Sequence, residues 1–414
     1  MGQAFRWKAR HTVLAIIFFS WIVSFMDRIA MSVAIPYIAV DFDLSPLAMG
    51  VVMSAFFASY SISHIPGGLF ADMFGVRKVA TIGMVWWSAF TAITGVVANL
   101  TQMLTARFVF GLGEGVYPAC SFKTVAVWFP KSERAMASSI MLAATSLGAA
   151  ISPLLVGWIM SSWGWRAAFY SLSLPGALVA LLFWIFIPNK PADSKRVSSD
   201  ELKEIEEDYA GQSSEEKIEY REIIRQPYIL KYFFALFSFD IAYWGFTTWL
   251  PTYLVKARGF SMTEMGIVAS LPFFAGVVGS LLGGWLSDKC FSENRKIPII
   301  STQLLAALCL YLTFASKSEA MLIVWQTLAG FGLKFFFSTF WALPMNTVPR
   351  KLMGITSGFI NMAAQIAAFI SPLCVGYLVG ISGGKFSLTF EFMIASIFVS
   401  CAIIFTLPNK MQSD

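Results

Sequence analysis

Long apolar runs recur along the whole of this 414-residue chain, and they constrain its fold more than any other feature. A helical run of about twenty apolar residues is long enough to cross a hydrocarbon core about 30 Å thick. Because 57% of the residues are hydrophobic and only 13% are charged, the chain cannot cover itself with polar surface. We therefore predict an all-α integral membrane protein with lipid as its solvent.

The polar residues between these runs predict twelve transmembrane helices. The expected spans are 12-35, 46-70, 79-98, 103-127, 135-160, 166-187, 229-254, 264-286, 297-315, 319-345, 353-379 and 387-407. An even number of spans leaves both termini on one side, and most of the 30 Lys and Arg residues fall in segments on that side. Because basic loops are typical of the cytoplasmic face, we expect a multi-pass protein of the cell membrane, plasma or inner, with both termini in the cytoplasm.

Short strings on one side of a polar linker return on the other side at nearly one offset. They are ISPLLVGW (151-158) with ISPLCVGY (370-377), GLG (111-113) with GFG (330-332), and GGLFAD (67-72) with GGWLSD (283-288). Such repetition indicates a duplicated six-span unit, the parallel repeat of a two-bundle transporter. We expect an N-terminal six-helix half at 1-188, a cytoplasmic linker at 189-228 and a C-terminal six-helix half at 229-414, as two pseudo-symmetric bundles around a central cavity.

The linker is rich in Lys, Glu, Asp and Ser, and its charge run predicts a solvated cytoplasmic surface. The stretch ELKEIEEDY (201-209) is expected to form a short amphipathic helix. A regulatory or partner-binding role for the linker is the alternative interpretation.

Several classes of protein are not favoured by this composition. The net charge is +6, but the basic residues form short clusters without interleaved aromatics, so we expect no nucleic-acid partner. The five cysteines are widely spaced and have no histidine at metal-ligand spacing, so no metal site and no cofactor is expected. No nucleophile, base or metal cluster occurs at catalytic spacing, which argues against an enzyme.

Seven ionisable residues fall inside the predicted spans. They are Asp27, Arg28, Arg107, Glu114, Lys123, Asp240 and Lys334. An ionisable side chain at bilayer depth is costly unless it faces a partner or a wet cavity, so each is a candidate functional residue. All seven lie on span 1, 4, 7 or 10, the first helix of each three-helix repeat, which is expected to line the cavity.

Four of these charges are predicted to share one level of the membrane. Arg107 and Glu114 are seven residues apart on one helix face, and Gly111 between them leaves room for a ligand or a neighbouring helix. Asp27 and Arg28 fall at a similar depth on span 1. Buried carboxylates can load protons near neutral pH while the cations hold an anion, which predicts a proton-coupled anion carrier. Structural ion pairing between helices is the alternative.

The other three intramembrane charges have separate interpretations. Asp240 and Lys334 fall at a similar depth, which makes them a candidate charge pair across spans 7 and 10, in the cavity or as a purely structural contact. Lys123 lies near the inner end of span 4 and points away from Glu114, so we expect its ammonium group to reach toward the membrane surface.

Three motifs at these positions resemble those of the major facilitator superfamily. FMDR (25-28) resembles a first-span motif, RFVFGLGEG (107-115) a span 4 signature, and GGLFADMFGVRK (67-78) the general loop motif. Within the superfamily the resemblance is to the anion:cation symporter branch, which contains bacterial galactonate, hexuronate and glucarate carriers and animal vesicular glutamate transporters and sialin. The resemblance covers essentially the whole chain and implies the major facilitator fold.

This resemblance implies roles for residues of the first half. Arg28 and Arg107 are expected to hold the substrate carboxylate, while Asp27 and Glu114 are expected to be protonation sites. Tyr60 matches a tyrosine that hydrogen-bonds the substrate, with plain helix packing as the alternative.

The resemblance also implies roles for five further residues. Trp341 and Asn361 match second-half residues that contact the sugar-acid chain, and helix packing is the alternative for Trp341. Asp72, Arg77 and Lys78 belong to the loop motif, and they are expected to form a gate that latches the two halves in the outward-facing state.

Two departures from the pattern of this branch bear on the substrate. His64 stands where many relatives have glutamine, and it is either a titrating group or a packing residue. Ala144 and Thr145 stand where sugar-acid carriers of the branch tend to have a polar amide. The expected substrate is therefore a small organic anion, a carboxylate that is either a sugar acid or a smaller, less hydroxylated acid.

We expect a monomeric secondary transporter that carries this anion together with protons by alternating access. Two alternatives remain open. The first is a sodium- or phosphate-coupled anion carrier, which uptake under separate sodium and pH gradients would distinguish. The second is a transport-dead membrane sensor, which would bind ligand without moving it.

Overall fold

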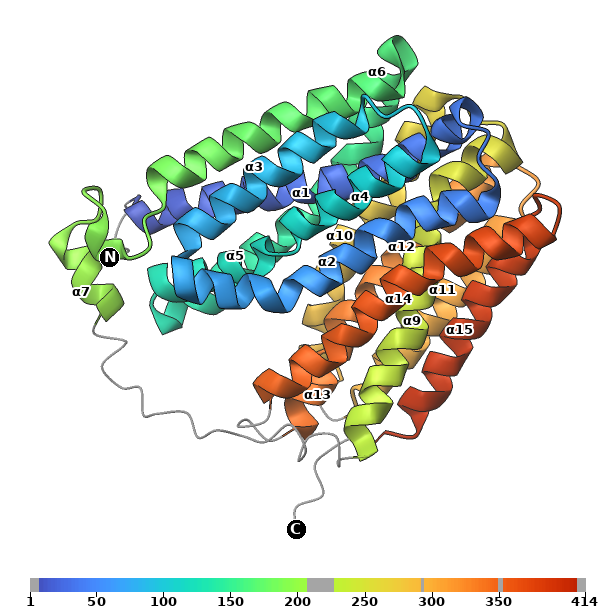
Figure 1. The fold of residues 1–414 in the computed structure, drawn as a ribbon. Helices are drawn as coiled ribbons and strands as arrows, with labels where there is room; N and C mark the ends of the chain where they lie inside the picture. Colours follow the sequence, from blue (N-terminus) through green and yellow to red (C-terminus); the bar gives the residue numbers. More distant parts are fainter. Residues whose placement is uncertain (1–6, 207–226, 292–293, 349–352, 408–414) are drawn as a thin grey trace. The chain divides into compact units, whose positions relative to one another are not determined.

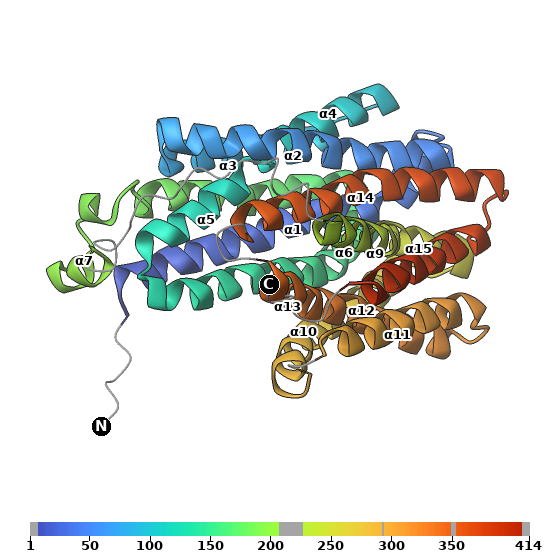
Figure 2. The same ribbon diagram turned by 90° about the horizontal axis from the view of Figure 1, so that it is seen from below.

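The computed structural model describes residues 7–206, 227–291, 294–348 and 353–407. Within these ranges the chain consists of helices joined by turns and short loops, with no β-strand (Figure 1). Figure 2 shows the same helices from below. The predicted all-α class is confirmed.

The helices of the first part of the chain follow the predicted spans. In order they are α1 (Ala9–Asp41), α2 (Pro46–Phe74), α3 (Val76–Thr94), α4 (Leu100–Glu114), α5 (Tyr117–Trp128) and α6 (Lys131–Phe186). Asn99 caps α4, because its side chain accepts a hydrogen bond from the backbone N–H of Gln102 at 2.9 Å. Predicted span 103-127 is divided, since a turn at Gly115 and Val116 separates α4 from α5.

Two short elements and a second series of long helices follow α6. They are the 3-10 turn η1 (Pro191–Asp193), α7 (Ser199–Glu206), α9 (Pro227–Thr252), the π-helical turn η2 (Tyr253–Ala257), α10 (Met262–Lys289), α11 (Lys296–Ala315), α12 (Glu319–Phe340), α13 (Ala342–Thr347), α14 (Met353–Ile381) and α15 (Ser387–Phe405). A capping box begins α10: the Ser261 hydroxyl accepts from the N–H of Glu264, whose carboxylate accepts from the N–H of Ser261 at 3.0 Å.

Nine described helices are long and apolar enough to cross a membrane. One of them, α6, has 56 residues and supplies two spans, because two helices meet at a kink at Gly164. The φ of Gly164 is 78°, in the left-handed region that glycine adopts without steric cost. Counted with α3 and with α4 followed by α5, these helices supply the twelve spans that the sequence predicts.

The chain folds into two compact units. Unit 1 comprises Met1–Ala30, Ala55–Ser152 and Ser162–Glu215, and unit 2 comprises Met31–Ser54, Pro153–Ser161 and Glu216–Asp414. Each of α1, α2 and α6 therefore contributes residues to both units. The division into halves at 1-188 and 229-414 stays a prediction.

In unit 2, the first part of α2 packs closely against α14. A Cβ atom at Gly50 would lie 2.5 Å from the carbonyl oxygen of Pro372, so only glycine fits at this contact. Nearby, the Ser54 hydroxyl donates to the Phe369 carbonyl at 2.7 Å. Close approach through small residues and hydroxyl hydrogen bonds is typical of packing between membrane helices.

The linker helix α7 caps the start of α1 in unit 1. The carboxylate of Glu201 accepts hydrogen bonds from the backbone N–H groups of Ala9 at 3.1 Å and Arg10 at 3.0 Å. The first N–H groups of a helix have no partner within it, and a negative charge there is favourable. Glu201 is buried, so this part of the linker is not the solvated surface that its charge run predicts.

Ion pairs reinforce the attachment of α7. The buried Arg10 guanidinium donates to Glu204 at 3.0 Å and to Glu133, at the start of α6, at 2.9 Å. Lys8 also pairs with Glu204. The hydrogen bond from Arg10, with that from Lys8, lowers the pKa of Glu204 to about 2, so this carboxylate is charged at physiological pH. These contacts tie the starts of α1, α6 and α7 together.

Candidate functional site

Four of the seven intramembrane charges lie together in unit 1. Asp27 and Arg28 come from α1, and Arg107 and Glu114 come from α4. Their exposed fractions are 1%, 8%, 2% and 1%, respectively. Removing such groups from water is costly unless other groups compensate. Their mutual arrangement therefore decides what this site can do.

Glu114 is the hydrogen-bond acceptor at the centre of this group. Its Oε1 accepts from Nη2 of Arg28 at 2.7 Å and from the Ser24 hydroxyl at 2.6 Å. Its Oε2 is buried and has no hydrogen-bond partner in the part of the chain that the structure describes. Ser24 is not among the residues predicted from the sequence, although its spacing of four residues from Arg28 places both on one face of α1.

The Asp27 carboxylate interacts electrostatically with charged groups that it does not contact directly. Neither of its carboxylate oxygens has a hydrogen-bond partner among the described residues. It interacts across space with Arg107, which is favourable, and with Glu114, which is not. The Thr91 hydroxyl lies beside it but donates to the Trp87 carbonyl at 3.0 Å. Asp27 is therefore a buried carboxylate with no ion pair or hydrogen bond to its oxygens in the part of the chain that the structure describes.

Arg107 is held over aromatic rings. Its guanidinium carbon lies 4.4 Å from the ring centre of Phe110 and 5.3 Å from that of Phe56. Its Nε is buried and has no hydrogen-bond acceptor within the described ranges. A cation over an aromatic ring gains about 0.5–2 kcal/mol, which holds the guanidinium in place without satisfying its N–H donors.

Three aromatic rings also surround Arg28. Its guanidinium carbon lies 4.5 Å from the ring centre of Phe25, 5.0 Å from Phe56 and 4.6 Å from Tyr60. The sequence indicates Tyr60 but not the two phenylalanines. Phe56 precedes Tyr60 by four residues on α2, so helical spacing was a usable signal for it. The ring of His64 follows on the same helix, 5.2 Å from that of Tyr60.

The sequence allows two roles for Gly111, room for a ligand or room for a neighbouring helix. The structure shows a neighbouring helix at this position. A Cβ atom at this position would lie 2.6 Å from the carbonyl oxygen of Phe56 and 3.1 Å from the backbone nitrogen of Tyr60. The backbones of α4 and α2 therefore meet between Arg107 and Glu114.

We expect Gly111→Ala to destabilise the protein. The added methyl group would push α4 away from α2, and overpacking of this kind costs about 1–3 kcal/mol. Gly68→Ala is the matched control on α2, because its Cβ would meet only Ala119, at 3.9 Å. Thermal unfolding in detergent measures both variants. Equal unfolding midpoints for the two would contradict this account of the contact.

The loop-motif residues form contacts at the end of α2 in unit 1. Lys123 pairs with Asp72 and donates to the Ala71 carbonyl at 3.0 Å. The expectation that Lys123 reaches toward the membrane surface is therefore incomplete, since its ammonium group has a carboxylate partner. Arg77 donates from Nε to the Trp184 carbonyl at 2.7 Å.

Lys78, the third residue of the predicted gate, is exposed. Beside the loop-motif residues, α5 and α7 line a cavity of about 450 Å³ that includes Asp72 and Lys123. The cavity also includes Glu206 of the linker helix. The described part of the linker and the loop motif therefore border one space in unit 1.

The remaining predicted residues belong to unit 2. Asp240 on α9 is fully buried, and Lys334 on α12 is half-buried. The two interact across space but form no direct ion pair, although both lie in described ranges. Trp341 follows α12 and is half-buried, and Asn361 is exposed on α14.

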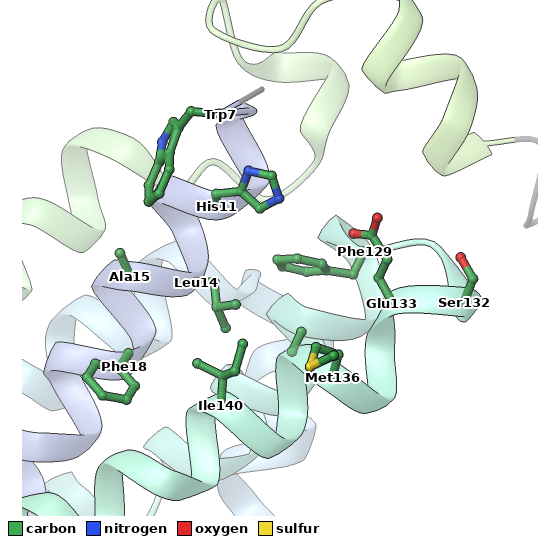
Figure 3. A pocket seen from close by; sticks show the side chains of 11 residues that line it. Trp7, His11, Leu14, Ala15, Phe18, Phe129, Ser132, Glu133, Met136 and Ile140 are labelled. Atoms are coloured by element: carbon green, nitrogen blue, oxygen red, sulfur yellow. The ribbon is translucent and has the colours of Figure 1, made fainter. Parts of the chain in front are cut away.

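A separate cavity of about 610 Å³ lies between the starts of α1 and α6 in unit 1. Figure 3 shows Trp7 and His11 on the α1 side, with Glu133 and Met136 on the α6 side. Its lining is mainly apolar and contains none of the predicted site residues.

The membrane-spanning helices and the group of buried charges define a multi-pass transport protein of the membrane. The family model of the Major Facilitator Superfamily matches residues 17–372, and the chain belongs to this superfamily. The predicted family and fold are thereby confirmed, and the chain is a transporter by family and not an enzyme.

Two curated relatives match nearly the whole chain. The "Probable galactarate/D-glucarate transporter GarP" of Escherichia coli (strain K12) is 32% identical, over 96% of this chain and 93% of the relative. The "Probable sulfoacetate transporter SauU" of Cupriavidus necator is 30% identical, over 99% of this chain and 98% of the relative. Both names describe transporters of organic acids.

The fold is also that of solved transporters. A bacterial homolog of the human lysosomal transporter Spinster, in an inward-facing and unoccupied conformation, superposes with a TM-score of 0.80 at 19% identity. The superposition covers 97% of each chain. At this identity the match shows the fold alone.

Proposed function

We propose that the protein is a secondary active transporter that carries a small organic anion together with protons. The observation that carries this proposal is the buried group in unit 1, where Arg28 donates to Glu114 at 2.7 Å, while the Asp27 carboxylate and Nε of Arg107 have no hydrogen-bond partner among the described residues. Two guanidinium and two carboxylate groups balance one another. Protonation of the carboxylates leaves two positive charges, and an anion can then replace the lost negative charge.

The proposed cycle uses Glu114 as the coupling residue. When Glu114 takes up a proton, its attraction for Arg28 weakens, and the guanidinium becomes available to a substrate carboxylate. Asp27 plays the same part toward Arg107, with which it interacts across space. Loss of the protons restores the carboxylate charges, which compete with the substrate for the arginines and so favour its release.

Tyr60 is the further substrate-binding residue that we propose in unit 1, because its ring lies 4.6 Å from the Arg28 guanidinium carbon. Trp341 and Asn361 are proposed as substrate contacts of unit 2, and the resemblance to sugar-acid carriers is the support for both. Asp72, Arg77 and Lys78 are proposed to act as a conformational gate.

The relatives and the site together support the proposed substrate class. The relatives' names describe galactarate, D-glucarate and sulfoacetate, all small organic acids. A pair of buried arginines suits acid groups of this kind, because guanidinium forms two parallel hydrogen bonds with a carboxylate. We propose a monomer in the plasma or inner membrane, with both termini in the cytoplasm, that works by alternating access.

Uptake by reconstituted protein tests the coupling ion. Purified protein in sodium-free vesicles with an alkaline interior should accumulate radiolabelled galactarate or sulfoacetate. One pH unit stores about 1.4 kcal/mol per proton, enough for about tenfold accumulation. A sodium gradient at equal pH should drive none. Accumulation with sodium alone would replace proton coupling with sodium coupling, and binding without any flux would indicate a sensor.

A further inference from the structure

A third cavity in unit 1, of about 420 Å³, lies between the end of α2, the start of α3 and the turn that separates α4 from α5. In the part of the chain that the structure describes, Lys78 is the one charged residue of its lining. Four exposed apolar side chains border the cavity: Phe70, Phe74, Ile82 and Trp86. An exposed apolar surface of this kind on a membrane protein is typical of contact with lipid. The cavity is therefore suited to an apolar chain.

This cavity is separate from the buried charges of the candidate functional site. Gly113 lines the cavity, while the carboxylate of the next residue, Glu114, accepts from Ser24 and Arg28 on α1. Successive residues of an α-helix point about 100° apart, so the cavity and the buried charges use different faces of α4. A ligand in this cavity would not be the transported anion.

Close packing of α3 against α4 forms the deep end of the cavity. The indole N–H of Trp86 donates to the Val109 carbonyl at 2.8 Å. A Cβ atom at Gly83 would lie 2.8 Å from Cγ2 of Val116 and 2.9 Å from the carbonyl oxygen of Gly113. Because these glycines carry no side chain, the two helices approach closely, and the hydrogen bond holds the Trp86 ring as a fixed wall of the cavity.

Lys78 lies at the end of the cavity that we expect at the membrane surface. It is exposed, and it directly precedes the predicted span 79-98 on the side expected to be cytoplasmic. Its ammonium group forms no ion pair with a carboxylate of the described residues. Eight residues separate Lys78 from Trp86, which is about 12 Å along α3. A free cation at the end of a long apolar space matches a ligand with a negative head and an apolar tail.

We propose that this cavity binds an anionic phospholipid of the inner leaflet, with the headgroup phosphate against Lys78 and one acyl chain beside Trp86. Charge complementarity favours an anionic headgroup, because a lysine near the membrane surface attracts anionic lipid. The apolar lining favours an acyl chain over a free phosphate ion. This site does not involve the transported anion, so the inference goes beyond the proposed function.

Native mass spectrometry of the purified full-length protein tests the headgroup, because it resolves lipid molecules that bind one at a time. Delipidated protein is titrated with phosphatidylglycerol or with phosphatidylcholine of identical acyl chains. Wild type should bind one phosphatidylglycerol about fivefold more tightly than phosphatidylcholine, which is the effect of one lysine at an anionic surface. Equal affinities for the two lipids would show nonspecific lipid contact alone and would overturn the inference.

Lys78→Gln should lower the affinity for this first phosphatidylglycerol to that for phosphatidylcholine. Lys195→Gln is the matched control, because Lys195 is an exposed lysine of unit 1 that does not line the cavity, and it should bind like wild type. Lys78 is also a proposed gate residue, but this measurement records lipid binding and does not depend on transport. Equal lipid affinities in the two variants would exclude Lys78 as the headgroup ligand and overturn the inference.

Ile82→Trp tests the apolar part of the site. Ile82 is 64% exposed, so a larger ring fits without disturbing the fold and occupies the space of the acyl chain. This variant should lose the tight phosphatidylglycerol and keep the unfolding midpoint of wild type in lipid-free detergent. Glycerol phosphate, which carries the headgroup charge without the tail, should not displace the lipid. Displacement by glycerol phosphate, retained tight binding in Ile82→Trp, or a dimer in place of bound lipid would each overturn the inference.

Discussion

Glu114→Gln is expected to abolish proton-driven accumulation while it preserves exchange of substrate across the membrane. Glutamine has nearly the shape of glutamate, and its carbonyl oxygen can still accept from Arg28 and Ser24, which lie 2.7 and 2.6 Å from Oε1. It cannot take up or release a proton, so the step that links the proton to the anion is lost. Counterflow and uphill uptake in the same vesicles measure the two activities.

Ser24→Ala is the control for this prediction. It removes one hydrogen bond to the same oxygen but leaves the carboxylate able to bind a proton, so accumulation should persist. The loss of a single hydrogen bond to a charged group costs about 1.5–3 kcal/mol. The Ser24 variant is therefore expected to accumulate less substrate than wild type but not to lose accumulation. Full accumulation by Glu114→Gln would remove Glu114 from the coupling mechanism.

The charged part of the site is predictable from sequence because the membrane makes it conspicuous. A charge in an apolar span is costly, so Asp27, Arg28, Arg107 and Glu114 stand out in an otherwise apolar chain. Helical spacing then places Arg107 and Glu114 on one face of α4. The structure brings all four together, as this reasoning predicts.

The apolar part of the site is not predictable in the same way. The chain has 39 phenylalanines, so nothing in their number distinguishes Phe25 and Phe56 from residues that face lipid. Phe25 is three residues from Arg28 on α1, but the contact of Phe56 with Arg28 depends on how α1 and α2 are rotated about their own axes. The sequence pattern of one helix does not fix that rotation, since contacts between helices determine it.

The ends of helices are likewise only partly predictable from the sequence. The sequence places a break at 161-165, between the fifth and sixth predicted spans, and the kink at Gly164 confirms it, but the turn takes a single residue and α6 continues on both sides of it. Likewise the charged linker predicts solvent exposure, yet Glu201 is buried because it accepts the unpaired N–H groups at the start of α1. Capping by a residue about 190 positions distant leaves no local signal.

Arg107→Ala is expected to abolish substrate binding. Arg107 is buried, its Nε has no acceptor among the described residues, and its charge is the favourable interaction that Asp27 has across space. Truncation removes the proposed ligand of the substrate carboxylate and leaves Asp27 without compensation. Loss of one partner of a buried charge pair costs about 2–5 kcal/mol, which corresponds to an affinity at least about 30-fold weaker. Calorimetry with galactarate and with sulfoacetate measures this loss of affinity.

Two further variants separate this loss of binding from a loss of folding. Arg107→Lys keeps the positive charge opposite Asp27 but lacks the planar fork, so it should fold as well as wild type and bind only weakly. Arg196→Ala removes an exposed arginine outside the site, whose guanidinium carbon lies 4.0 Å from the ring centre of Phe186, and binding should not change. Unchanged affinity in Arg107→Ala would exclude this arginine from the substrate site. In that case the group in unit 1 would be a structural ion network, the alternative that buried charge in a membrane helix bundle always allows.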